Sequence, residues 1–221
     1  MLNFWILGMN SRNLEYIKKF NPKKWIRLAD NKLKTRRFME ARGIPVPTTY
    51  DVIRNRRQLY TYNFRHLPAD EFIVKPNKWS RGRGIYRVKL TDEKVEHSSP
   101  LNRMDRLFTA RSPYWYEQYK ISGKLVEDTD FRRYLVDILD GKSSIGSRHD
   151  TIILEELLLP WSWFEAYCDH WLADIRIIVF NLVPVAAMLR IPTEESDGKA
   201  NLDRWAAVSY THLRAHETTS H

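Results

Sequence analysis

The chain lacks the features that mark secreted and membrane-spanning proteins. Its 221 residues include one cysteine, Cys168, so no disulfide can form within the chain. A reducing compartment is therefore expected. No hydrophobic run is long enough to cross a bilayer. The apolar start, Met1–Met9, lacks the basic flank and the long apolar core of a signal peptide. We expect a soluble, cytoplasmic protein.

Internal repeats, low-complexity tracts and metal-ligand spacings are also missing. His149, His170 and Cys168 are not spaced like the ligands of a zinc site. Hydrophobic residues make up 43% of the chain and aromatic residues 13%, which is enough for a real core. The net charge of +9 predicts an anionic partner or substrate, and a nucleotide, a nucleic acid or an anionic membrane surface would each qualify.

The hydrophobic pattern mixes helices with strands. Helices are expected over residues 10–20, 30–42, 54–64 and 130–139. Strands are expected over residues 48–53, 72–75, 85–90, 152–159, 174–181 and 183–191. The last two strands would form a hairpin, and residues 121–141 would form a surface module. Because helices are mixed with strands in hairpins, we expect an α+β fold rather than a purely parallel sheet.

The stretch from Phe72 to Ile85 carries the clearest chemical signal. An apolar strand ends at Lys75, a basic loop with Gly82 and Gly84 follows, and apolar residues then return. Glycine lets backbone N–H groups approach an anion because no Cβ blocks the way. Lysine and arginine supply the matching charge. A loop over a polyphosphate and an ordinary basic hairpin turn both fit this segment taken alone.

Eight segments follow one another in an order that resembles the ATP-grasp superfamily. They are Asp30–Thr35, Gly43–Pro47, Ile73–Pro76, Ser80–Gly84, Ile153–Leu157, Asp174–Ile177, Met188–Arg190 and Ser196–Leu202. The most similar group is the RimK-like, alpha-L-glutamate ligase-related one, also described as sugar-transfer-associated ATP-grasp proteins. The resemblance implies an ATP-grasp fold, in which the nucleotide lies between two α+β subdomains.

The resemblance also implies a reaction. In this superfamily a substrate carboxylate attacks the γ-phosphate of ATP to give an acylphosphate, from which an amine displaces phosphate. We therefore expect an ATP-dependent carboxylate–amine ligase, with ATP and Mg²⁺ as cofactors and a small carboxylate or peptide as substrate. No membrane or nucleic-acid partner is implied. The alternatives are a basic nucleic-acid-binding module and a catalytically inactive ATP-binding adaptor.

The phosphate contacts implied by the resemblance come from two lysines and the glycine loop. Lys32 would reach the α-phosphate, with Lys34 as the alternative by register. Lys75 would be the second phosphate lysine, and an outward-facing strand lysine is the alternative. The mobile cover over the phosphates would contain Ser80, Gly82 and Gly84.

Adenine contacts are implied for the end of the strand at residues 153–157. Glu155 would accept a hydrogen bond from the adenine amino group, and the backbone of Glu156 and Leu157 would bind the adenine edge. The register between Glu155 and Glu156 stays open, because a slip of one residue reverses the face of a strand. A surface glutamate at a strand end is the alternative.

The hairpin at residues 174–191 would contact the γ-phosphate or the substrate carboxylate. Asp174, assigned to the nucleotide site, and Arg176 share one face of a strand because side chains alternate. Arg190 follows on the partner strand, and Asn201 lies in a family loop near the nucleophile. Arginine forks suit carboxylates and phosphates. A cross-strand Asp–Arg pair worth about 0.2–1 kcal/mol is the alternative.

The domain organisation expected from the resemblance has three parts and a tail. Residues 1–47 would be an N-terminal helical and linker portion, residues 48–150 a small subdomain with the phosphate loop and a helical insertion, and residues 151–208 the start of the C-terminal subdomain. Residues 209–221 do not match the family, and we expect a non-native tail there. Family Mg²⁺ ligands lie on later strands, so we assign no metal ligand and expect an incomplete fragment of low activity.

Overall fold

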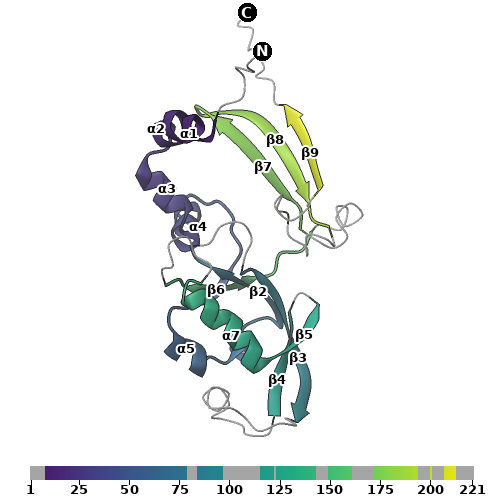
Figure 1. Ribbon diagram of the computed structural model, residues 1–221. Helices are drawn as coiled ribbons and strands as arrows, with labels where there is room; N and C mark the ends of the chain where they lie inside the picture. Colours follow the sequence, from purple (N-terminus) through teal and green to yellow (C-terminus); the bar gives the residue numbers. More distant parts are fainter. Residues whose placement is uncertain are drawn as a thin grey trace, which may run out of the picture.

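The computed structural model describes residues 8–78, 84–96, 115–121, 123–142, 149–160, 172–193, 200 and 207–212. Within these ranges the chain forms a six-stranded sheet and a three-stranded sheet, both antiparallel (Figure 1). Helices pack against the six-stranded sheet and beside one end of the three-stranded sheet. The family resemblance led us to expect such an α+β fold.

The N-terminal part of the described chain is helical. Its elements are α1 (Met9–Ser11), the π-helical turn η1 (Arg12–Ile17), α2 (Lys18–Phe20), α3 (Lys23–Ala29) and α4 (Lys32–Glu40). The Asn31 side chain caps α4 by accepting a 2.9 Å hydrogen bond from the Lys34 N–H. Gly43, at φ 67°, follows the helix in the left-handed conformation. The helices expected at residues 10–20 and 30–42 are confirmed, whereas α3 was missed.

The six-stranded sheet has the order β1-β6-β2-β3-β4-β5. Its strands are β1 (Thr49–Ile53), β2 (Glu71–Pro76), β3 (Tyr86–Glu96), β4 (Trp115–Ile121), β5 (Lys124–Glu127) and β6 (Ile152–Glu156). The helices α5 (Arg56–Thr61), η2 (Phe64–His66) and α7 (Asp128–Leu139) connect them. Register pairs Val74 of β2 with Leu154 of β6, so these two side chains project to the same face of the sheet.

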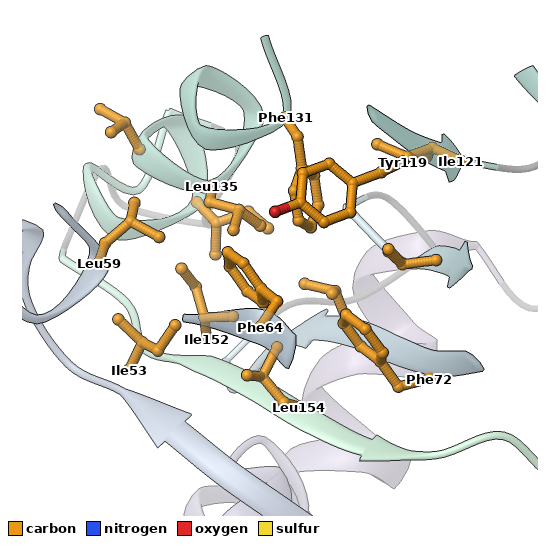
Figure 2. Close-up of a cluster of buried hydrophobic side chains, with 14 of the residues drawn as sticks. Ile53, Leu59, Phe64, Phe72, Tyr119, Ile121, Phe131, Leu135, Ile152 and Leu154 are labelled. Carbon is orange, nitrogen blue, oxygen red and sulfur yellow. The ribbon is translucent and has the colours of Figure 1, made fainter. Parts of the chain in front are cut away.

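One face of this sheet forms the hydrophobic core under α7. Phe72 and Leu154 project from the sheet toward Phe64 and Phe131, and all four side chains are fully buried (Figure 2). The Phe64 and Phe131 rings lie 5.2 Å apart between centroids. The expected helix at residues 130–139 is confirmed, but the surface module expected at residues 121–141 is wrong. Its apolar residues recur at helical spacing, and that stripe lies in the core.

The three-stranded sheet has the order β7-β8-β9, with β7 (Asp174–Phe180), β8 (Val183–Ile191) and β9 (Ala207–His212). The expected hairpin is confirmed, and Asn181 and Leu182 turn it with positive φ angles of 46° and 68°. Residues 209–212, part of the expected tail, continue β9 beside β8. Within the described residues, no helix is long and apolar enough to span a membrane.

Candidate functional site

The candidate site lies on the face of the six-stranded sheet opposite the α7 core. Register places Ile73 opposite Glu155 and Lys75 opposite Ile153. Because side chains alternate along a strand, these residues project to the same face. Ile153 and Glu155 are 1% and 5% exposed, so a carboxylate is buried beside an apolar neighbour. The helix α4 supplies charged side chains to this face.

Glu155 is bound by two cations that come from different elements. Arg36 of α4 donates from Nη2 to Oε2 of Glu155, and the Nζ of Lys75 on β2 pairs with Oε1. The Arg36 and Lys75 side chains are 10% and 19% exposed. A buried carboxylate without a counter-ion is strongly destabilising, so both cations have a physical reason to be there. The inward position predicted for Lys75 is therefore found in the structure.

Sequence reasoning missed Arg36, although a signal for it was present. Arg36 follows Lys32 by four residues, and residues with this spacing lie on one side of a helix. Lys32 was predicted as a site residue, so its neighbour one turn along was a candidate. Arg36 Nη1 is buried and has no hydrogen-bond partner within the part of the chain that the structure describes.

Lys32 lies at the start of α4, next to the end of β2. Its Nζ donates to the carbonyl oxygen of Pro76 at 2.8 Å and, more weakly, to that of Asn77 at 3.5 Å. Burial and the positive charge of Lys75 lower the pKa of Lys32 to about 8, while Asp150 and Glu155 act in the opposite direction. The structure thus brings Lys32 into the same cluster as Lys75.

The register alternative, Lys34, does not share this position. Its side chain is exposed, and its backbone N–H caps the helix through Asn31. Lys32, by contrast, is partly buried against β2. Lys32 therefore has the burial and the lowered pKa expected for a residue in a charged site, whereas Lys34 is exposed.

Two further buried polar residues hold the end of β2 in place. Asn77 accepts a 3.0 Å hydrogen bond from the Leu33 N–H through Oδ1, which ties β2 to α4. Asp150 accepts hydrogen bonds from the Lys78 N–H at 2.9 and 3.1 Å. Both residues are 5% exposed or less. They fix the backbone just before the predicted phosphate loop, and sequence reasoning did not single them out.

The predicted loop is only partly described. Ser80 and Gly82 lie outside the described residues. Gly84 lies two residues before the first residue of β3 and has a φ angle of 70°. Side chains with a Cβ rarely adopt this conformation, so a glycine has a backbone reason to be there. The phosphate-covering role of the loop stays a prediction.

The two glutamates at the end of β6 have different surroundings. Glu155 is buried between Arg36 and Lys75, whereas the Glu156 carboxylate accepts a 2.9 Å hydrogen bond from the Thr48 N–H. That hydrogen bond lowers the pKa of Glu156. Leu157 follows directly after the strand. The charged cluster therefore contains Glu155 and not Glu156, and the adenine contacts predicted for residues 155–157 stay predictions.

The other predicted residues lie on the three-stranded sheet. Asp174 and Arg190 are register partners and form a bidentate ion pair, in which Arg190 Nε donates to Oδ1 at 2.5 Å and Nη2 to Oδ2. Arg176 pairs with Met188 and is exposed. Asn201 lies outside the described residues. The predicted residues that the structure describes thus form two groups, one at or next to α4, β2, β3 and β6 and the other on β7 and β8 (elements labelled in Figure 1).

The first group has the charge expected of an anion site. Lys32, Arg36 and Lys75 surround Glu155, and Asp150 is close enough to influence Lys32. Among the described residues Arg36 Nη1 is buried without a hydrogen-bond partner, and a donor in that state costs about 1–3 kcal/mol. The positive charge of this group suits a polyphosphate. The described residues contain no group of three or more His, Cys, Asp or Glu that could hold a metal ion.

Comparison with known protein families gives a match over most of the chain. A family model described as sugar-transfer associated ATP-grasp matches residues 11–109 and 114–208. The matched segments include every residue of the Glu155 cluster and of the Asp174–Arg190 pair. No curated protein and no solved structure matches this chain.

Proposed function

The chain belongs to the sugar-transfer associated ATP-grasp family, and from this premise we propose that it is an ATP-dependent carboxylate–amine ligase. The narrower likeness to RimK-like alpha-L-glutamate ligases, with a small carboxylate or peptide as substrate, is part of this proposal. So is a cytoplasmic location. An ATP-grasp domain is an ATP-dependent ligase-type domain. The proposal concerns the particular reaction of this chain and the residues that carry it out.

The observation that supports the proposal is the gathering of Lys32, Arg36 and Lys75 around one buried carboxylate. Arg36 and Lys75 pair with Glu155, and Lys32 lies close enough to interact with their charges, so the group has positive charge that a nucleotide phosphate can neutralise. Charge-assisted hydrogen bonds between an ammonium group and a phosphate are short and strong. We propose that Lys32 and Lys75 bind the phosphates and that residues 80–84 cover them.

The remaining contacts belong to the proposal as well. Glu155 would accept from the adenine amino group, and the backbone of Glu156 and Leu157 would bind the adenine edge. Asp174 would belong to the nucleotide site. Arg176, Arg190 and Asn201 would orient the γ-phosphate and the substrate carboxylate.

In the proposed reaction a carboxylate oxygen forms a bond to the γ-phosphorus, and the bond from that phosphorus to ADP breaks. The amine then forms a bond to the acyl carbon, and phosphate leaves. Arginine side chains suit both steps because their forks stabilise charge that develops on oxygen. Mg²⁺ would neutralise phosphate charge when bound.

Nucleotide binding by matched lysine variants tests this function. We expect Lys32→Met and Lys75→Met each to weaken ATP binding by about tenfold or more, because each removes a buried charge-assisted contact. The matched control is Lys34→Met, which removes the same charge from an exposed position on α4. Isothermal titration calorimetry measures the three affinities against the unsubstituted chain.

Two outcomes would contradict the proposal. An equal loss of affinity in Lys34→Met would mean that the overall charge, and not this cluster, attracts ATP. Tight RNA or DNA binding with a steep salt dependence and no effect of ATP would favour the basic nucleic-acid-binding module instead.

A further inference from the structure

Glu155 shares its two carboxylate oxygens between two cations that differ in how freely they can move. Arg36 projects from the middle of α4, and Lys75 lies one residue before the end of β2. Lysine carries its charge on a flexible four-carbon stem, whereas the guanidinium group of arginine is a planar fork. Lys75 is also the more exposed of the two. Of the two cations, Lys75 is the one suited to leave.

We propose that Arg36 is a positioning residue: it stays with Glu155 as a permanent counter-ion, so that Lys75 can exchange its carboxylate partner for a nucleotide phosphate. This proposal rests on the proposed function, in which Lys75 binds phosphate. It assigns Arg36 no contact with the nucleotide. Arg36 acts through Glu155 and determines how easily Lys75 becomes available.

The buried Nη1 of Arg36 gives this exchange a geometric basis. In the structure Nη2 donates to Oε2 of Glu155, and Nη1 has no partner within the described chain. When Lys75 leaves, Oε1 of Glu155 loses its donor. Nη1 can then donate to Oε1 and complete a two-bond fork between the guanidinium and the carboxylate. The exchange therefore ends with both Glu155 oxygens paired.

Without Arg36 the same exchange would be costly. Glu155 is 5% exposed, so the departure of Lys75 would leave a buried carboxylate with no counter-ion. Removing one partner of a buried ion pair is strongly destabilising for this reason. Lys75 would then stay with Glu155, and a nucleotide would have to compete with that pair. Loss of Arg36 should therefore weaken nucleotide binding even though Arg36 does not touch the ligand.

A double-mutant cycle tests the proposal by calorimetric ATP titration. We expect Arg36→Met to weaken ATP binding by about tenfold or more, because the Lys75–Glu155 pair then resists exchange. In the Glu155→Gln background the same substitution should change affinity by less than about threefold, since the carboxylate through which Arg36 acts is gone. Arg37→Met is the matched control, because Arg37 is an exposed arginine on the same helix. It should leave affinity unchanged.

The cycle also has outcomes that overturn the proposal. Equal losses from Arg36→Met in both backgrounds would mean that Arg36 contacts the nucleotide directly. Unchanged affinity in Arg36→Met would mean that Arg36 is dispensable. Arg36→Lys keeps the charge and should recover part of the loss. No recovery in a variant that melts like the unsubstituted chain would also overturn the proposal.

Amine labelling of Lys75 in the absence of nucleotide separates this proposal from the proposed function. Lys75 should react more slowly in Arg36→Met, where it is the remaining counter-ion of Glu155 in the pair described above. It should react faster in Glu155→Gln, where the carboxylate that pairs with Lys75 is gone. If the unsubstituted chain bound no ATP, the proposed function would fail, while these labelling rates would still support the coupling of Arg36, Glu155 and Lys75. Labelling rates unaffected by both substitutions would overturn the coupling itself.

Discussion

The lowered pKa of Lys32 makes nucleotide binding sensitive to pH in a range that is easy to measure. Burial and the charge of Lys75 lower this pKa to about 8, against the opposing effects of Asp150 and Glu155. Arg36, on the same helix, adds a further positive charge nearby. A phosphate placed against the Lys32 ammonium group would favour its charged form and raise the pKa again. Binding would then be coupled to the uptake of a proton.

The magnitude follows from the two pKa values. At pH 7 about nine tenths of Lys32 is protonated in the free chain, and at pH 9 about one tenth, because one pH unit is a factor of ten. If bound phosphate returns the pKa of Lys32 to its ordinary value of 10.5, ATP affinity falls about tenfold between pH 7 and pH 9, or about 1.4 kcal/mol. The last pKa of a phosphate group is about 6, so its ionisation is about nine tenths complete at pH 7 and ATP itself adds little above that pH.

Calorimetric titrations at pH 7, 8 and 9 measure this dependence. Repeating each titration in buffers of different ionisation enthalpy gives the number of protons taken up, which should approach about one per nucleotide at pH 9. Lys32→Met is the control, and its weaker affinity should not depend on pH in this range. Equal affinity of the unsubstituted chain at pH 7 and pH 9, or the same pH dependence in Lys32→Met, would refute the reasoning.

The same pKa shift has a consequence for stability with a definite sign. The unfolded chain keeps Lys32 protonated until near pH 10.5, whereas the folded chain loses that proton near pH 8. Between these values the unfolded state binds more protons, so the contribution of Lys32 to the free energy of unfolding rises with pH. In the window from pH 8 to 10.5, affinity for ATP and this contribution should therefore change in opposite directions.

Two further predictions concern stability. Phe131→Ala should lower the free energy of unfolding, measured in urea, by about 3–5 kcal/mol, because it empties a fully buried position. The control Tyr134→Ala, at an exposed position of the same helix, should lower it far less. Asp174→Asn removes one partner of the half-exposed Asp174–Arg190 pair and should cost about 0.2–1 kcal/mol by the same assay, so a clearly larger loss would contradict its description as a cross-strand surface pair.

Local patterns were enough to predict much of the fold. The helix at α4 begins after a capping Asn31 and ends before Gly43, and both signals are present in the sequence itself. The β7–β8 hairpin and the two strands on either side of the glycine loop were predicted from their runs of β-branched and apolar residues. Lys32 and Lys75 were predicted from the order of the family motifs. Apart from the two lysines, these features depend on neighbours close by in the sequence.

The cluster around Glu155 could not be predicted in the same way. Arg36 and Glu155 are 119 residues apart, and they meet only because α4 packs across β2 and β6. The burial of α7 depends likewise on which face of the sheet its apolar stripe meets. Helical periodicity shows that a stripe exists, but not what covers it. The missed α3 begins after Pro22, without a hydrogen-bonding cap from that residue.

The two faces of the six-stranded sheet have different roles. Side chains on the face under α7 stabilise the fold, and those on the opposite face form the proposed nucleotide site. Burying Arg36, Lys75 and Glu155 opposes folding, because charges lose their hydration when they leave water. The face under α7 offsets that cost through residues such as Phe72 and Leu154, which are fully buried on the same two strands. Because side chains alternate, Leu154 and Glu155 are adjacent in sequence yet face opposite sides. Substitutions of Leu154 should therefore act on stability, whereas substitutions of Glu155 should act on nucleotide binding and also on stability, because they leave Arg36 and Lys75 without their buried partner.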